Sequence, residues 1–147
     1  MYKRQPPDNT SLFTSAWVWD NAGNYQSPPT WINFSTGSAD TSPPTASITA
    51  PSTNSVSAGD LNITGTANDN VAVQRVELVI KDTTNNLWWD GLTWIDSYAR
   101  VLTNYNGVEW EYSANLPPNI SVYLGAWAWD TSQNRITIPT QFSFTTE

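Results

Sequence analysis

Cysteine and histidine are both absent from the 147 residues of this chain. Their absence excludes a disulfide framework, thiol and imidazole chemistry, and the usual zinc ligand sets. Basic residues are scarce, with six Lys and Arg against thirteen Asp and Glu and a net charge of −7. This balance argues against a phosphate-binding surface, so we expect no nucleic-acid partner. No apolar run approaches the ~20 residues of a membrane span, so we expect no membrane insertion in this fragment.

The residues that are present favour strands and turns. Nine tryptophans occur in a chain of few charges, and Ser, Thr and Asn dominate its polar positions. No window of a dozen residues has a helical period. Alternating strand patterns recur at the spacing of an all-β domain. They cover residues 45–50, 61–67, 73–81, 109–113, 121–130 and 135–145.

An internal repeat gives the domain organisation. Residues 6–20 (PPDNTSLFTSAWVWD) match residues 117–130 (PPNISVYLGAWAWD), and from Trp17 onward the offset is a constant 110 residues, with one residue inserted or deleted just before it. A period near 110 residues corresponds to one all-β domain. We therefore expect neighbouring repeats of the same chain to be its partners.

The repeat predicts three segments. Residues 6–37 are the C-terminal hairpin of a preceding, truncated repeat. Residues 38–44 form a linker stiffened by its two prolines, and residues 45–147 form a complete domain. Residues 1–5 (MYKRQ) resemble read-through of a sequencing adapter, a contaminant at the ends of metagenomic gene fragments, and are predicted to be non-native. The alternative is a basic juxtamembrane or targeting segment.

Residues 82–106 form an insert longer than a plain loop. Asp90-Gly91 between apolar residues predicts a two-residue type I′ turn, with Trp89 paired with Leu92. In that register Leu87 pairs with Trp94. The insert is therefore predicted to add an extra hairpin at a sheet edge.

Several motifs together resemble the bacterial immunoglobulin-like repeats of large secreted and cell-surface proteins. The matching features are Pro43-Pro44, TGTANDNV at 64–71, VELVI at 76–80, the WDG…W pattern at 89–94, and AWDTSQN at 128–134. Gln133 departs from the glycine usual in the last turn. The resemblance implies an immunoglobulin-like β-sandwich of about seven to nine strands with the extra edge hairpin. It further implies an architectural role, an extracellular or cell-surface location, and no catalytic site.

One end of the expected sandwich gathers oxygen ligands that suit calcium. In that fold the chain entry, the second-to-third-strand loop and the last hairpin turn lie together. They carry the candidate calcium ligands Asp40, Asp69, Asn70, Asp130 and Asn134. Ca²⁺ prefers such oxygen ligands. The alternative is that these side chains cap their own turns, and no other cofactor is expected.

The tryptophans are the second group of candidates. Strand alternation places Trp127 and Trp129 on the outer face of their strand, away from Val122, Leu124, Ala126 and Ala128. Three interpretations stay open: a sugar-stacking platform, a small second core covered by the 82–106 insert, and a protein-binding patch. The candidate ligand-binding residues are Trp88, Trp89, Trp94, Trp127 and Trp129.

We therefore predict a non-catalytic spacer, stalk or adhesive module of a long extracellular bacterial protein. The alternative is a carbohydrate-binding accessory module of a secreted polysaccharide-degrading enzyme, and surface glycans or another protein are the partners left open. No catalytic residue is predicted, because Asp90 belongs to a turn and Glu109 and Glu111 alternate outward on a strand.

Overall fold

The computed structural model describes residues 6–147. The chain forms two compact units, which meet in sequence at Asp40 and Thr41. Every regular element in the described residues is a β-strand, which confirms the all-β prediction. Among these residues there is no helix with the length and hydropathy to cross a membrane. The adapter interpretation of residues 1–5 lies outside the described residues.

The first unit is a single antiparallel hairpin of β1 (Ser11–Ala16) and β2 (Thr30–Ser35). It contains no second layer, and its large apolar side chains lie open to solvent. The exposed ones are Phe13, Trp17, Val18, Trp19, Tyr25, Trp31, Ile32 and Phe34. This unit therefore has the apolar residues of a strand pair that belongs in a core, but no second sheet covers them. An isolated hairpin of this kind is only marginally stable in water.

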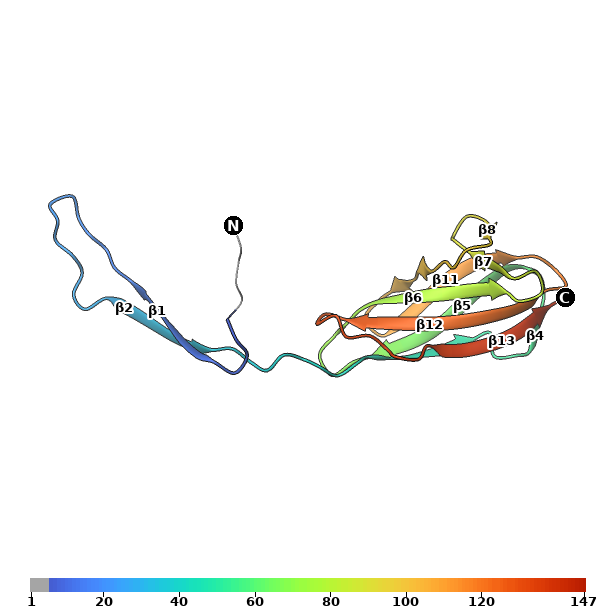
Figure 1. Cartoon of the computed structure of the whole chain (residues 1–147), viewed down its shortest axis with the longest axis horizontal. Coiled ribbons are helices and arrows are strands. Elements are labelled where there is room, and N and C mark those ends of the chain that lie inside the picture. The colour runs from blue at the N-terminus through green and yellow to red at the C-terminus, as the bar shows by residue number, and fades with distance from the viewer. Residues whose placement is uncertain (1–5) are drawn as a thin grey trace. The chain divides into compact units, whose positions relative to one another are not determined.

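The second unit is a sandwich of two sheets (Figure 1). One sheet has the order β10-β11-β5-β3, and the other has the order β4-β13-β12-β6-β7-β8 with β9 on β6. The strands of the first are β10 (Asn104–Tyr105), β11 (Glu109–Leu116), β5 (Gly59–Asn68) and β3 (Thr45–Ala50). Those of the second are β4 (Ser55–Val56), β13 (Thr140–Thr146), β12 (Ser121–Asp130), β6 (Val73–Asp82), β7 (Leu87–Trp89), β8 (Trp94–Ile95) and β9 (Val101–Leu102). The predicted β-sandwich is confirmed.

The core lies between the two sheets and follows strand alternation. The inward residues of β6 are Val76, Leu78 and Ile80, and all are fully buried. From the other sheet, Trp110 packs over Gly65, where a Cβ would lie 2.3 Å from the indole and 1.9 Å from the Ser47 carbonyl oxygen. Glycine is therefore required at position 65, because any side chain there would displace the largest buried residue of the core.

The predicted turn of the insert is wrong in register. Trp89 pairs with Trp94 rather than with Leu92, and Trp88 pairs with Ile95. The Asp90 carboxylate accepts the N–H groups of Leu92 and Thr93, both at 2.8 Å. This side-chain cap stabilises a four-residue loop in place of the two-residue turn. The predicted pairing of Leu87 with Trp94 fails with it, because Trp94 pairs with Trp89. On its other side, β7 pairs Leu87 with Asp82 of β6.

The hairpin of β12 and β13 has the same backbone pairing as the hairpin of β1 and β2. Ser121 to Ala126 pair with Thr145 to Thr140, and Ser11 to Ala16 pair with Ser35 to Thr30. These registers agree at an offset of 110 residues along both strands. The turns agree as well, because Asp20 accepts the side-chain amide of Asn24 and Asp130 that of Asn134, both at 2.7 Å.

The offset of 110 also holds before the strands. The Thr36 hydroxyl donates to the Pro7 carbonyl at 2.6 Å, and the Thr146 hydroxyl donates to the Pro117 carbonyl at 2.7 Å. The inserted or deleted residue expected before Trp17 is therefore wrong. In backbone geometry Pro7 corresponds to Pro117, so no residue is gained or lost.

The chain enters and leaves the second unit at opposite ends. β3 begins at the end where Thr45 pairs with Asn68, and Glu147 accepts the Ala58 N–H at the far end, beside the start of β5. Figure 1 shows the C-terminus at that far end, away from the strand that enters the sandwich. The point where the chain enters the sandwich and the point where it leaves are therefore separated by the length of the sandwich.

Candidate functional site

The outer face of the β6–β12 pair carries the two outward tryptophans of β12. Trp127 lies opposite Glu77 and Trp129 opposite Arg75 in the strand register. The other side of β12 is core, with Val122, Leu124 and Ala126 buried. The predicted division of β12 into two faces is therefore confirmed.

Basic side chains cover these rings. The guanidinium of Arg75 lies 4.4 Å from the Trp129 ring centre, and that of Arg100 lies 5.1 Å from Trp127 and 5.3 Å from Trp129. Arg135 lies 5.6 Å from Trp127. These distances are within cation–π range. The rings are thus covered by guanidinium groups rather than by apolar side chains.

The same layer continues along the sheet edge. Lys81 lies 4.7 Å from the Trp88 ring, and Trp88 meets Tyr98 edge-on at 4.8 Å. Tyr98 in turn accepts the Arg100 Nε–H at 2.8 Å. We name this surface the arginine–tryptophan face. It consists of Arg75, Lys81, Arg100, Arg135, Trp88, Trp127, Trp129 and Tyr98.

Glu77 orients the two central guanidiniums. Its carboxylate accepts Arg75 Nε–H at 2.9 Å and Arg100 Nη1–H at 3.2 Å. Burial alone would lower the pKa of Arg100, but the hydrogen bonds to Tyr98 and Glu77 outweigh it and raise that pKa. The Glu77 carboxylate therefore holds both guanidiniums in place.

The second-core interpretation, in which the 82–106 insert covers this face, is wrong in part. Trp89 and Trp94 turn away from it and pack against the core, where Trp89 Nε1–H donates to the Tyr112 hydroxyl at 3.0 Å. The Trp89 hydrogen bond links β7 to β11 of the other sheet. Arg100, from the later part of the insert, supplies the cover instead. Sequence reasoning missed this layer, although Arg75 and Lys81 alternate outward on the same side of β6.

A sugar-stacking platform needs open, coplanar rings, whereas these rings are not coplanar, Trp129 is buried and Trp127 is half-buried. Trp127 and Trp129 are tilted by 37°, and Trp129 is only 8% exposed. The faces of both rings are in contact with guanidiniums. The outer surface here presents positive charge and N–H donors rather than bare indole.

The acidic candidates include a close pair. Within the second unit, one carboxylate oxygen of Asp69 lies within 4.8 Å of one of Asp130. Asp40 ends the first unit, and its role as a ligand stays a prediction. Asp69 Oδ1 is buried and accepts no hydrogen bond within the described residues. Such an oxygen fits a cation ligand.

The same residues also cap turns, as the alternative interpretation expects. Asp69 Oδ2 accepts the N–H groups of Val71 and Ala72, at 2.9 and 3.1 Å. Asp130 is fully buried, and Asn134 donates to both of its oxygens at 2.7 Å. Asn134 therefore serves a turn. The predicted role of Asn70 as a ligand is untested, and calcium stays a prediction.

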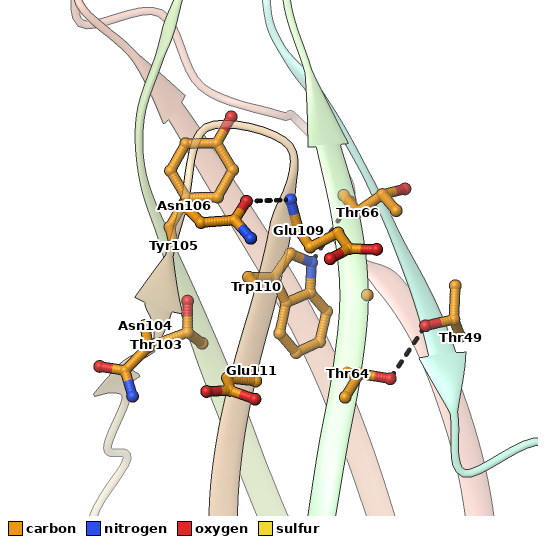
Figure 2. A pocket seen from close by; sticks show the side chains of 11 residues that line it. Thr49, Thr64, Thr66, Thr103, Asn104, Tyr105, Asn106, Glu109, Trp110 and Glu111 are labelled. Carbon is orange, nitrogen blue, oxygen red and sulfur yellow. Dashed lines mark hydrogen bonds between the residues drawn. The ribbon is translucent and has the colours of Figure 1, made fainter.

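A polar groove of about 610 Å³ lies on the opposite sheet (Figure 2). Glu109 and Glu111 of β11 line it together with Thr66 and Thr64, the residues of β5 with which they pair. Asn106 accepts the Glu109 backbone N–H at 2.8 Å. Both carboxylates lie on the solvent side of β11 and are exposed, so this groove is a hydrated acidic surface.

The comparison with known families agrees with this geometry. A family model described as a bacterial Ig domain matches residues 44–138, which is more than half of the chain. No curated protein matches the chain. The match covers the sandwich from Pro44 through the last turn, and so includes β6, the insert and β12.

Proposed function

Because the chain belongs to the bacterial Ig domain family, we propose that it is a spacer module from a tandem array in a long extracellular bacterial protein. Domains of this family are structural repeat modules of bacterial proteins, and they often occur in extracellular ones. They are typically non-catalytic. The spacer would hold another domain away from the cell surface.

The repeated hairpin is the observation that carries this proposal. The hairpins β1–β2 and β12–β13 share their strand register and their turn. In each, a threonine hydroxyl also donates to a proline carbonyl, that of Pro7 or Pro117. The second is integrated in a sandwich and the first is not. This supports β1–β2 as the C-terminal hairpin of a preceding repeat, followed by a linker of residues 38–44.

The path of the chain supports a spacer. Entry and exit at opposite ends of the sandwich let each added repeat extend an array by about one domain length. In arrays of this type each repeat contacts its neighbours and stability is roughly a sum over repeats. Neighbouring repeats are therefore the proposed partners.

The other functions considered have less support. A carbohydrate-binding accessory module that stacks sugars on bare tryptophan would need a pair of open, coplanar rings, whereas Trp129 is buried, Trp127 is half-buried and the two rings are tilted by 37°. An enzyme would require a buried acid–base arrangement, whereas Glu109 and Glu111 are solvent-exposed strand residues. Adhesion remains part of the proposal, because spacers commonly present binding faces.

Single-molecule stretching tests the spacer role. Four copies of residues 38–147 in series should unfold one at a time at similar forces. Each event should release roughly 30–35 nm, the extended length of about 105 residues less the folded length. In bulk, deleting residues 1–42 should leave the Tm of the sandwich within about 4 °C, the shift expected for 1 kcal/mol.

Two results would oppose the proposal. One is that the four copies extend without separate unfolding events, because the domains of a spacer must each stay folded under force. The other is a large fall in Tm on deletion of residues 1–42. That fall would make the first hairpin part of the sandwich rather than the remainder of another repeat.

A further inference from the structure

All four basic side chains of residues 41–147 lie on the arginine–tryptophan face. That range contains four basic and ten acidic residues. Among the described residues, Glu77 is the only carboxylate that forms ion pairs with the four cations. The domain is therefore acidic overall but positive on one sheet face. Such separation favours binding of anions at that face over non-specific attraction to the whole domain.

The cations on this face have hydrogen-bond donors to spare. Arg75 uses Nε and Nη1, and Arg100 uses the same two nitrogens. Their Nη2 groups make no hydrogen bond within the described residues. The side chains of Lys81 and Arg135 contact rings but likewise donate no hydrogen bond within the described residues. Guanidinium N–H groups match the geometry of carboxylate oxygens.

Ring stacking prepares these groups for binding. A long side chain that is already fixed loses little rotamer entropy when a ligand arrives. Glu77 fixes Arg75 and Arg100, and the rings of Trp127 and Trp129 support them from below. Tyr98, 52% exposed, lies beside them and offers an open ring to the apolar edge of a ligand.

We propose that the arginine–tryptophan face binds an acidic polysaccharide whose sugar rings carry carboxylates. Arg75 and Lys81 are six residues apart on β6, about 20 Å along the strand. A linear polymer with regular charges can therefore meet several cations at once, which multiplies its affinity. An acidic polypeptide carries similar charge, but its flexible backbone loses more entropy on binding than a stiff polysaccharide does.

This binding role goes beyond the proposed spacer, because a spacer needs no ligand. Experiments can also refute the binding role and the spacer role independently of each other. Loss of polysaccharide binding would leave unfolding under force unchanged, and failure as a force-bearing module would not alter binding by one face.

Titration calorimetry of the full chain with a soluble polyuronate tests the proposal. The buffer contains a chelator, so that calcium cannot bridge carboxylates between protein and polymer. We expect binding at low salt that weakens as salt screens the contacts. A neutral glucan of the same length should not bind. Poly-glutamate should bind at least about tenfold more weakly than the polyuronate.

Matched variants locate the binding face. Lys81→Gln with Arg135→Gln removes two charges that form no hydrogen bonds, and it should weaken binding about tenfold. The charge-conserving pair Lys81→Arg with Arg135→Lys should bind within about twofold of the parent. Glu109→Gln with Glu111→Gln changes the net charge by two in the opposite direction, on the opposite sheet, and should not weaken binding. The Tm of each variant verifies that it folds.

Several outcomes would overturn the proposal. They are absence of polyuronate binding, equal binding of the neutral glucan, and an unchanged affinity in the Lys81→Gln, Arg135→Gln variant. Poly-glutamate that binds as tightly as the polyuronate would instead assign the face to an acidic polypeptide.

Discussion

The two hairpins of this chain have the same backbone but opposite surroundings. Phe34 and Phe144 occupy matching positions in β2 and β13, yet Phe34 is 49% exposed and Phe144 only 3%. Trp19 and Trp129 also match, and Trp19 is 62% exposed. Strand register and turn geometry are therefore local properties of the sequence, whereas burial depends on a neighbouring strand such as β6 and on a facing sheet.

The outer faces of the two hairpins differ in one further way. Tyr25 stands where Arg135 stands in the second copy, and its ring lies 6.1 Å from Trp17, as Arg135 lies 5.6 Å from Trp127. A ring thus replaces a guanidinium over the equivalent tryptophan. Residues 6–40 contain no basic residue at all. If the first hairpin belongs to another repeat, that repeat has Tyr25 in place of the cation Arg135.

Truncation of the matched phenylalanines should give the largest contrast. Phe144→Ala should lower the free energy of unfolding by about 3–5 kcal/mol, because it leaves a cavity between the sheets. Phe34→Ala, in the exposed copy, should cost less than about 1 kcal/mol. Urea unfolding followed by tryptophan fluorescence measures both. Equal losses would mean that the first hairpin is buried in solution.

The matched tryptophans should give the next largest contrast. Trp129→Ala should cost about 3 kcal/mol, since the ring is buried under Arg75 and Arg100. Trp19→Ala should cost under about 1 kcal/mol. Thermal and urea unfolding of the two variants check this. A small loss at Trp129 would show that the guanidinium layer contributes little to packing.

Calcium should have a smaller effect. With a dissociation constant near 1 mM, about 10 mM Ca²⁺ would stabilise the fold by about 1.4 kcal/mol relative to chelator. Thermal unfolding in EDTA, Mg²⁺ and Ca²⁺ measures this, and Asp69→Asn should reduce the shift. An identical Tm in chelator and in Ca²⁺ would leave turn capping as the whole role of Asp69 and Asp130.

The smallest effect should come from the last turn, where Gly23 corresponds to Gln133. Both have positive φ, 88° and 71°, a region that glycine adopts without steric cost. Gln133→Gly should therefore stabilise the sandwich by about 0.5–1 kcal/mol, despite loss of the 3.3 Å contact with Gln74. Urea unfolding checks the sign. Destabilisation would show that the Gln74 contact outweighs backbone strain.

Local patterns in the sequence predicted much of the fold. Alternation identified the strands of residues 45–50 and 121–130 and the two faces of β12, because inward positions must be apolar. The repeat of Asp20 and Asn24 at Asp130 and Asn134 identified both turns. These features depend on neighbours along the chain or on burial of one face.

Contacts between distant segments were harder to predict. The turn type at Asp90 is decided by the Asp90 carboxylate, which accepts the N–H groups of Leu92 and Thr93. The position of Arg100 over Trp127 depends on where β9 pairs with β6. No spacing rule connects these residues. The sequence therefore offered a covered second core as one interpretation of Trp127 and Trp129, but it did not indicate that guanidinium groups form the cover.

The repeat-array account is tested most directly by giving the first hairpin its missing strands. Residues 43–120 fused ahead of residues 11–147 would supply them, because the offset of 110 places Ser11 where Ser121 stands. A second version carries Thr14→Leu, the residue found at position 124. Hydrogen exchange of β1 and β2 is the measurement. The account predicts that both strands become as protected as β12 and β13; strands that still exchange freely in both fusions would contradict it.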